Sequence, residues 1–248
     1  GPMMGGCLEE VIKFLRIRYD SEPEKIPKGY KIEIGFQDKY VLKDGPSAAT
    51  VFTLLLDSLF SGEALDENFA CTGDMTADGM VQNIGGAAAK IRGATKRGCK
   101  IVGIPTGNGK EIGDVLLLDG IEQLLDIQIF TLKDFDEAYA VSRAEKAPEV
   151  TETLELFKAV ADVIREKGED VLSNSEVQKR LETVIERMPN HLSAKLLLEK
   201  GKGEEPKILT VGGTLNQIEI ATSATLRSVG SAVFMARMKD DEDDDSDA

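Results

Sequence analysis

The chain has 248 residues, and its 44 acidic side chains outnumber 30 lysines and arginines to give a net charge of -14. Such an excess of negative charge argues against a surface that follows nucleic-acid phosphates. The sequence holds one histidine, which excludes mechanisms and metal sites that need two imidazoles. Its three cysteines form no C-x-x-C pair, so neither a zinc site nor a disulfide framework is indicated. We therefore expect no metal and no cofactor.

The sequence also indicates where the protein works. Its apolar stretches are too often interrupted by charged and polar residues for a transmembrane helix, and no signal peptide is evident. Unpaired cysteines are typical of a reducing compartment. The expectation is a cytoplasmic protein that binds neither membranes nor nucleic acid.

Short β-rich runs alternate with helical patterns between Gly29 and Ser142, which is typical of an α/β layer fold. A leading helix is predicted at about Leu8–Tyr19. Strands are predicted at Tyr30–Phe36, Phe69–Thr76, Met80–Ile84, Lys100–Ile104 and Ile127–Leu132. Further helices are predicted at Ser47–Ser61, Gly86–Arg97, Ile112–Asp119 and Phe135–Arg143.

After Ala147-Pro148 the strand signals nearly disappear, and apolar residues follow helical spacing. The sequence therefore predicts an α/β domain over residues 1–147 and an all-α C-terminal segment over residues 148–238. In that segment, Thr214–Met238 is predicted to be a long helix that packs on its own chain or offers a face to a partner. Residues 239–248 are predicted to be an acidic, disordered tail.

Ser47 stands where a helix is predicted to begin. Gly45 permits a tight turn and Pro46 is favoured in a helix's first turn, so Ser47 is expected at or just inside the N-terminus. Unpaired backbone N–H groups and the helix dipole at such a position are suited to stabilising an oxyanion. A serine there is also an ordinary helix cap, and spacing alone does not separate the two interpretations.

A serine nucleophile needs a base, and the composition restricts the choice. His191 lies beside Pro189 in the helical segment, far in sequence from the α/β domain. Lysine is the natural substitute. Because its ordinary pKa is about 10.4, it must lie in a dry site without a carboxylate partner if it is to be neutral near neutral pH.

Lys90 meets that requirement. Its neighbours one turn away on the predicted helix are the small residues Gly86, Ala87, Gly93 and Ala94. No carboxylate on that helix can hold the ammonium charged, and Arg97 would favour the neutral amine. The alternative is an ordinary lysine on a helix of small residues.

Four motifs in order resemble the proteolytic domain of Lon proteases. They are Asp44-Gly45-Pro46-Ser47-Ala48, Cys71-Thr72-Gly73-Asp74 leading to Gly79, Ile84-Gly85-Gly86 followed by Lys90, and Ile101–Pro105. Lon-type domains carry a Ser–Lys dyad, with the serine in a D-G-P-S-A motif and the lysine 43 residues later, after an I-G-G turn. Lys90 follows Ser47 by the same 43 positions. The resemblance covers roughly residues 6–141 and implies a Lon-type α/β fold followed by the all-α segment.

The resemblance also implies roles for individual residues. Ser47 would be the nucleophile, and Lys90 the general base that later protonates the leaving amine. Thr72 matches the threonine whose hydroxyl hydrogen-bonds the dyad lysine. Gly85 matches the glycine beside the active site, and Asp44 matches the aspartate that shapes the nucleophile loop.

The sequence departs from the family pattern near these residues. The family's T-G-E becomes Thr72-Gly73-Asp74, P-S-A-G becomes Pro46-Ser47-Ala48-Ala49, and G-G-L-K-E-K becomes Gly85-Gly86-Ala87-Ala88-Ala89-Lys90. The last change removes a glutamate and a lysine next to Lys90, which puts specificity in question more than chemistry.

Lon proteins couple this domain to an ATPase. The nearest candidate here, Gly107-Asn108-Gly109-Lys110-Glu111, lacks the G-x-x-x-x-G-K spacing and the following Ser or Thr of a P-loop. The resemblance therefore implies a serine endopeptidase that, as this chain, cleaves unfolded or flexible polypeptides without ATP through an acyl-enzyme.

Two further expectations follow from the resemblance. The chain is expected to self-associate, as a hexamer if it follows Lon domains, and His191 is expected to be dispensable for turnover. The alternative function is a catalytically silent Lon-like scaffold for oligomerisation or partner binding. Retention of both dyad residues argues against it, since scaffolding requires neither.

Overall fold

The computed structural model describes residues 2–29, 31, 33–34, 45–215 and 217–222. Contacts gather the chain into two compact units, residues 1–207 and residues 208–248. In the second unit, residues 211–215 and 217–222 are helical, at the beginning of the predicted long helix. The remainder of that helix and the acidic tail lie outside the described residues. So do four of the seven residues of the predicted strand Tyr30–Phe36, and its described residues, 31, 33 and 34, form no strand.

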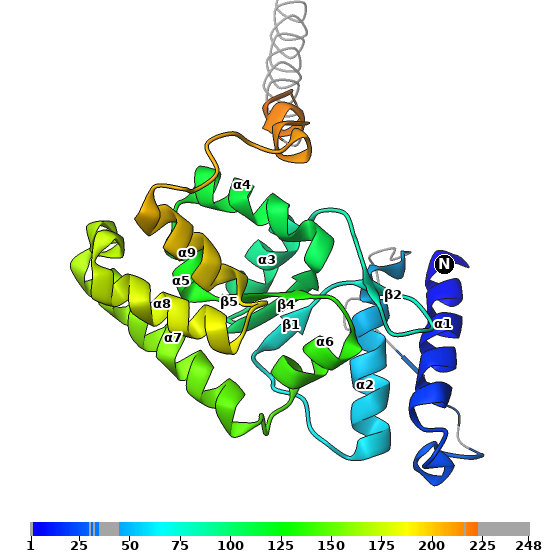
Figure 1. Cartoon of the computed structure of the whole chain (residues 1–248). Coiled ribbons are helices and arrows are strands. Elements are labelled where there is room, and N and C mark those ends of the chain that lie inside the picture. The colour runs from blue at the N-terminus through cyan, green and yellow to red at the C-terminus, as the bar shows by residue number, and fades with distance from the viewer. Residues whose placement is uncertain (1, 30, 32, 35–44, 216, 223–248) are drawn as a thin grey trace, which may run out of the picture. The chain divides into compact units, whose positions relative to one another are not determined.

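The centre of the first unit is a parallel sheet of three strands, in the order β1 (Phe69–Cys71), β4 (Ile101–Pro105), β5 (Gln128–Leu132) (Figure 1). β4 lies in the middle and pairs with both neighbours. Beyond the carboxyl end of β1, an antiparallel pair joins β2 (Asp74–Met75) to β3 (Val81–Gln82). The mixed α/β fold with a parallel sheet agrees with the prediction.

The strands are apolar because both faces of the sheet are covered. All five residues of β4 are buried. Ile104 belongs to a core cluster on one face, and Ile101 to a cluster on the other. In β5, Ile129 and Phe130 divide between the two clusters in the same way. This two-sided burial explains why the strand signals in the sequence are continuous apolar runs.

Helices cover both faces of the sheet. The first cluster lies among α3 (Ala87–Lys96), α4 (Gly109–Asp119), α5 (Glu122–Asp126), α7 (Pro148–Lys167), α8 (Ser175–Arg187) and α9 (Leu192–Lys202). The second lies among α1 (Pro2–Arg18), α2 (Ala49–Ser61) and α6 (Phe135–Ser142). Four 3-10 turns complete the described elements: η1 (Pro23–Lys25), η2 (Pro46–Ala48), η3 (Thr106–Asn108) and η4 (Glu169–Ser173).

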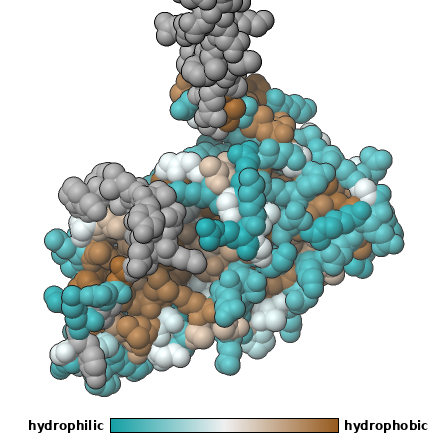
Figure 2. All heavy atoms as spheres, turned by 180° about the vertical axis from the view of Figure 1, so that it is seen from behind, coloured by the Kyte–Doolittle hydropathy of each residue, from teal (hydrophilic) through white to brown (hydrophobic). Residues whose placement is uncertain are grey.

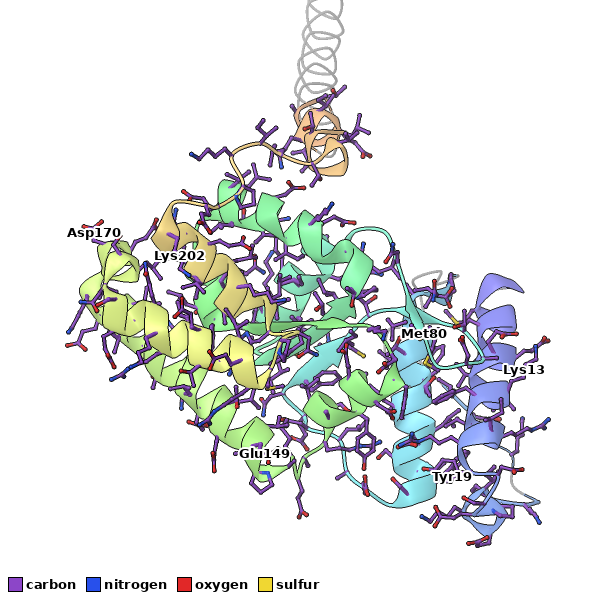
Figure 3. All side chains as sticks on the ribbon, viewed as in Figure 1. Lys13, Tyr19, Met80, Glu149, Asp170 and Lys202 are labelled. Atoms are coloured by element: carbon purple, nitrogen blue, oxygen red, sulfur yellow. The ribbon has the colours of Figure 1, made fainter. Side chains whose placement is uncertain are left out.

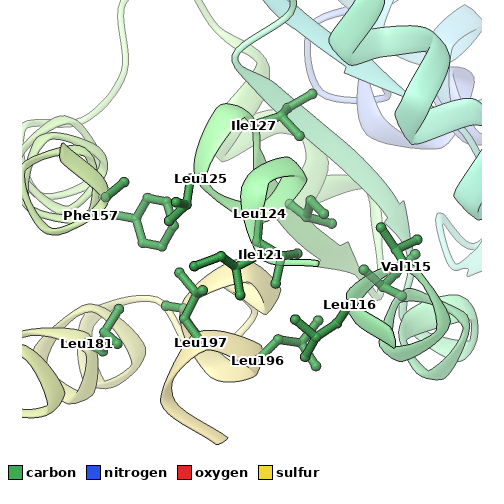
Figure 4. Packing of buried hydrophobic residues seen from close by; sticks show 14 of the residues in the cluster. Val115, Leu116, Ile121, Leu124, Leu125, Ile127, Phe157, Leu181, Leu196 and Leu197 are labelled. Carbon is green, nitrogen blue, oxygen red and sulfur yellow. The ribbon is translucent and has the colours of Figure 1, made fainter. Parts of the chain in front are cut away.

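The helices after residue 148 share their core with the sheet. Figure 4 shows Phe157 of α7 beside Leu125 of α5, in the same buried cluster as Leu181 of α8 and Leu197 of α9. The predicted change to all-α character coincides with the start of α7. It does not separate two independently packed bodies, because α7, α8 and α9 fall in the same compact unit as the sheet.

The segment before α9 and the first turn of α9 cover the outer edge of β5. The N–H of Thr131 donates to the carbonyl of Asn190 at 2.9 Å, and the N–H of Ile129 donates to Oγ of Ser193 at 2.9 Å. Ser193 Oγ donates in turn to the carbonyl of Ile127 at 3.2 Å. These bonds satisfy backbone groups that a free strand edge would leave open.

A buried carboxylate joins α1, α2 and α6. Asp57 of α2 is fully buried and accepts hydrogen bonds from Arg18 Nε at 2.9 Å, from the Tyr19 hydroxyl at 2.9 Å and from the Arg143 guanidinium. Tyr19 follows α1 and lies next to α2 (Figure 3). Because a buried charge that loses its partner is costly, these contacts fix α1 and α6 on α2.

Apart from the strand predicted at Tyr30–Phe36, the predicted elements up to residue 143 agree in type with the described ones, and their bounds differ for physical reasons. The predicted helix Ser47–Ser61 consists of η2 and α2. The predicted strand Phe69–Thr76 is interrupted at residues 72–73, where the chain turns toward η2. Helix α5 was not predicted, because five residues are too short for a periodic pattern. No helix in the described ranges is long and apolar enough to cross a membrane.

Candidate active site

Ser47 lies in the 3-10 turn η2, directly before α2. Pro46 occupies the first turn, as the sequence predicts, and the backbone N–H of Ala49 donates back to the Pro46 carbonyl. Ser47 is half-buried, whereas Ala49 and Thr50 behind it are fully buried. The apolar face of α2 therefore anchors the helix in the core and leaves Ser47 at the rim.

Residues 72–73, after β1, hold η2 in place. The carbonyl of Ser47 accepts from Thr72 Oγ1 at 3.0 Å and from the N–H of Gly73 at 2.9 Å. Thr50 closes the contact, since its N–H and its hydroxyl both donate to the Gly73 carbonyl at 3.1 Å. Glycine at position 73 permits this close packing, because an added Cβ would lie 2.6 Å from Thr50 Oγ1 and 2.7 Å from Val81 Cγ1 and would force these side chains to shift.

Lys90 comes from the first turn of α3. Gly86 starts that helix in the left-handed conformation, with φ of 70°, which glycine adopts without strain. The N–H of Lys90 donates to the Gly86 carbonyl at 3.1 Å. Ala87 and Ile91 face the core, so the half-buried Lys90 stands at the edge of the packed face.

The amine of Lys90 meets Thr72. Lys90 Nζ donates to Thr72 Oγ1 at 3.0 Å, and that hydroxyl donates to the Ser47 carbonyl. Within the described ranges, no ion pair joins Lys90 to a carboxylate. Burial lowers the pKa of Lys90 below its ordinary value, because desolvation disfavours the ammonium form. The environment therefore favours the neutral amine that a base requires.

The structure thus brings together Ser47, Thr72 and Lys90. In the part of the chain that is described, no hydrogen bond joins Ser47 Oγ to Lys90 Nζ, and Thr72 is the link between their segments. Gly85 is exposed, with open space around it. Asp44 lies outside the described residues. Sequence reasoning did not find the steric role of Gly73, although the tight Thr-Gly pair after a strand is a visible turn signal.

Other nucleophiles and bases are poorly suited to this role. Burial raises the pKa of the Cys71 thiol to about 12 and also raises that of Cys7, so neither is an activated thiolate. His191 is fully buried, and its pKa is lowered to about 3. The described residues contain no cluster of three or more His, Cys, Asp or Glu side chains that could hold a metal ion.

Sequence comparison gives a consistent match. Residues 9–140 match the family described as the Lon protease C-terminal proteolytic domain. The chain is 26% identical over 151 residues to a Lon protease of Desulforamulus reducens, covering 61% of this chain and 18% of that protein. It is 32% identical over 124 residues to a Lon protease of Orientia tsutsugamushi, covering 46% and 16%.

A peroxisomal relative also matches part of the chain. The chain is 37% identical over 106 residues to the peroxisomal Lon protease homolog 2 of Zea mays, covering 43% of this chain and 12% of that protein. The match therefore spans less than a fifth of each of these relatives.

Proposed function

The chain belongs to the family of Lon protease C-terminal proteolytic domains, which is a peptidase family, and from this premise we propose that it is a serine endopeptidase with a Ser47–Lys90 dyad. Its substrates are unfolded or flexible polypeptides, because a chain without fixed structure can present a backbone carbonyl to Ser47 in extended form. The chain acts on them without ATP.

The observation that carries the proposal is the hydroxyl of Thr72, which bonds both Lys90 Nζ and the Ser47 carbonyl, each at 3.0 Å. It ties the amine to the segment that carries the serine. The lowered pKa of Lys90 adds to this support, since a neutral amine can accept the proton of the serine.

The reaction follows from these groups. Neutral Lys90 takes the Ser47 proton as Oγ attacks the scissile carbonyl. Backbone N–H groups of η2, which leads into the N-terminus of α2, stabilise the oxyanion. The Lys90 ammonium then protonates the leaving amine, and an acyl-enzyme on Ser47 remains. Water attacks this ester with Lys90 again as the base, which restores the free serine.

The test compares cleavage of casein and of fluorogenic peptides by the wild type, Ser47→Ala and Lys90→Ala, with and without ATP. We expect the wild type to cleave without nucleotide and both variants to lose at least about a thousandfold in kcat. Wild-type turnover in either variant would contradict the dyad. Nucleotide-dependent cleavage by this chain would contradict the ATP independence.

A second measurement separates the peptidase from a silent scaffold. A fluorophosphonate probe should label Ser47 in the wild type and not in Lys90→Ala, with the modified peptide identified by mass spectrometry. Labelling depends on an activated hydroxyl and does not require a known substrate. A folded wild-type protein that remains unlabelled and inactive would favour the scaffold.

We also propose that the chain self-associates, as family membership suggests. Exposed apolar side chains gather on α1 and α2, where Ile17, Leu55 and Leu59 are 68%, 47% and 58% exposed. Figure 2 shows apolar surface on this side of the molecule. Contiguous apolar side chains on a surface mark candidate contact areas. Sedimentation of a strict monomer at micromolar concentration would contradict self-association.

A further inference from the structure

The turn after β4 contacts the turn that starts α3. Asn108, the last residue of η3, is only 2% exposed. Its Nδ2 donates to the Ile84 carbonyl at 2.8 Å, and its Oδ1 accepts from the Ile84 N–H at 3.0 Å. The side-chain amide thus pairs with both polar groups of one backbone residue, as a neighbouring strand would.

Asn108 does not cap the backbone of its own helix. It occupies the N-cap position of α4, where asparagine commonly accepts a hydrogen bond from the first turn, yet it makes no such bond. Its remaining amide hydrogen goes to Glu111 Oε1 at 2.6 Å. Both donors are used, and the oxygen is directed to Ile84, so the side chain is committed to the neighbouring turn.

Gly107 permits this close approach. A Cβ at position 107 would lie 2.1–2.5 Å from the side-chain atoms of Asn83. Any larger residue would require the Asn83 side chain to move. Gly107 therefore leaves room for Asn83, and Asn108 fixes the next residue, Ile84, by hydrogen bonding.

That segment leads directly to the site. Ile84 is followed by Gly85 and Gly86, and the Gly86 carbonyl accepts from the N–H of Lys90 at 3.1 Å. On the other side, the N–H of Thr72 donates to the carbonyl of Gly103 in β4 at 3.0 Å. β4 and the turn that continues it therefore hold both partners of the Lys90–Thr72 hydrogen bond.

We propose that Asn108 is a positioning residue for the Lys90 amine: by pairing with Ile84 it fixes the first turn of α3, so that Lys90 Nζ meets Thr72 Oγ1. The inference rests on the proposed function, in which Lys90 is the base. The Gly107–Glu111 run, which is not a P-loop, then helps to position the base of the peptidase site.

The pKa of Lys90 depends on its electrostatic surroundings and can therefore report on its position. Ionisable side chains on the elements packed against α3 are Lys110, Glu111, Asp114 and Asp119 of α4 and Glu122 and Asp126 of α5. Asp119 pairs with Arg92 at 2.6 Å, and burial alone lowers the pKa of Lys90. A looser first turn would admit water, so the pKa of Lys90 would return toward its ordinary value.

The experiment measures the pKa of Lys90 directly, by competitive acetylation of lysines with acetic anhydride across pH and mass spectrometry of the Lys90 peptide. Exposed Lys110 is the internal reference. The proteins are the wild type, Asn108→Ala and a matched control, Asn190→Ala. Asn190 also donates from a side-chain amide to a backbone carbonyl, that of Thr131 at 3.1 Å, but it lies away from α3. Peptide hydrolysis is measured in parallel.

We expect the pKa of Lys90 to lie below its ordinary value in the wild type and in Asn190→Ala, and to rise toward that value in Asn108→Ala. In that variant, kcat should fall by about tenfold or more with little change in KM, because the base is misplaced while substrate contacts remain. Glu111→Gln keeps the Ile84 pairing and should behave as the wild type. If Asn108→Ala does not fold, Asn108→Ser, which is too short to reach Ile84, is predicted to give the same shifts.

Two failures can be told apart. An unchanged Lys90 pKa and kcat in folded Asn108→Ala would overturn the positioning role, even where Ser47→Ala abolishes hydrolysis. Conversely, if the pKa of Lys90 shifts as expected but Ser47→Ala hydrolyses peptide like the wild type, the proposed function fails while the coupling of Asn108 to Lys90 stands.

Discussion

Lys90 and His191 are two nitrogen bases whose pKa is lowered by burial, and they lie in different surroundings. The Lys90 amine is half-buried, and its hydrogen bond goes to Thr72 in the same site as Ser47. His191 is completely buried, between the rings of Phe130 and Phe157, whose centroids lie 4.5 Å and 4.4 Å from that of its imidazole.

The two ring nitrogens of His191 are both engaged. Nε2 lies 3.0 Å from Gln128 Oε1, and Nδ1 accepts from the N–H of Ala194 at 3.2 Å, which caps α9. The imidazole therefore joins β5 to α9 and has no free position for a substrate. Desolvation lowers the pKa of both side chains, but only Lys90 combines a lowered pKa with a position in the same site as a hydroxyl nucleophile. A lowered pKa by itself does not identify a catalytic base.

The largest effect should come from removing the Lys90 amine. Lys90→Met keeps the apolar stem and its packing, so we expect kcat to fall at least about a thousandfold. The free energy of unfolding should stay the same or rise, because a partly desolvated cation is lost. Peptide turnover and urea denaturation measure the two quantities. Lys96→Met, an exposed lysine of α3, is the matched control and should change neither.

His191→Ala should give the opposite result. It removes a cap, a buried contact with Gln128 and the packing of two aromatic rings, so the free energy of unfolding should fall by about 3 kcal/mol. Turnover per folded molecule should be unchanged, as the sequence analysis predicts. A loss of turnover comparable to that of Lys90→Met, in protein shown to be folded, would mean that the two bases are not separate in function.

The burial of His191 should also make the free energy of unfolding depend on pH. In the unfolded chain His191 binds a proton below about pH 6.5, but in the folded protein its pKa is about 3. Protonation thus favours unfolding, so this stability is complete above about pH 6.5 and is lost as pH falls toward 3. Between pH 6.5 and 5 the loss amounts to about 2 kcal/mol. His191→Gln cannot titrate and should show a correspondingly weaker pH dependence in urea denaturation. Equal slopes would contradict the buried neutral imidazole.

The sequence predicted much of this because its signals are local or depend on fixed spacing. β4 and β5 are apolar runs, and α3 and α7 have clear periodicity. The candidate nucleophile and base, Ser47 and Lys90, came from motif spacing and a resemblance, and their roles remain predictions.

Contacts between distant segments could not be predicted in this way. Asn108 bonds Ile84 across 24 positions, and Arg143 bonds Asp57 across 86. Tertiary packing, which leaves no local pattern, places these groups together. For the same reason, the position of His191 in the sequence suggested that it is remote from the α/β domain, although it lies against β5.

Among the changes expected to alter turnover, the smaller loss of kcat should come from Thr72. Its hydroxyl contacts the base but takes no part in bond making. Thr72→Val keeps the shape and removes the hydroxyl that bonds Lys90 Nζ and the Ser47 carbonyl. Both segments also keep other hydrogen bonds. Gly73 N–H still bonds the Ser47 carbonyl at 2.9 Å, and Lys90 N–H still bonds the Gly86 carbonyl at 3.1 Å. We therefore expect kcat to fall by roughly tenfold, whereas Thr72→Ser should restore most of it. If Thr72→Val equalled Lys90→Met, the hydroxyl would have to act on the substrate itself. If it had no effect, the hydrogen bond to Lys90 would be irrelevant to the base, and the contrast between Lys90 and His191 would depend on access to solvent alone.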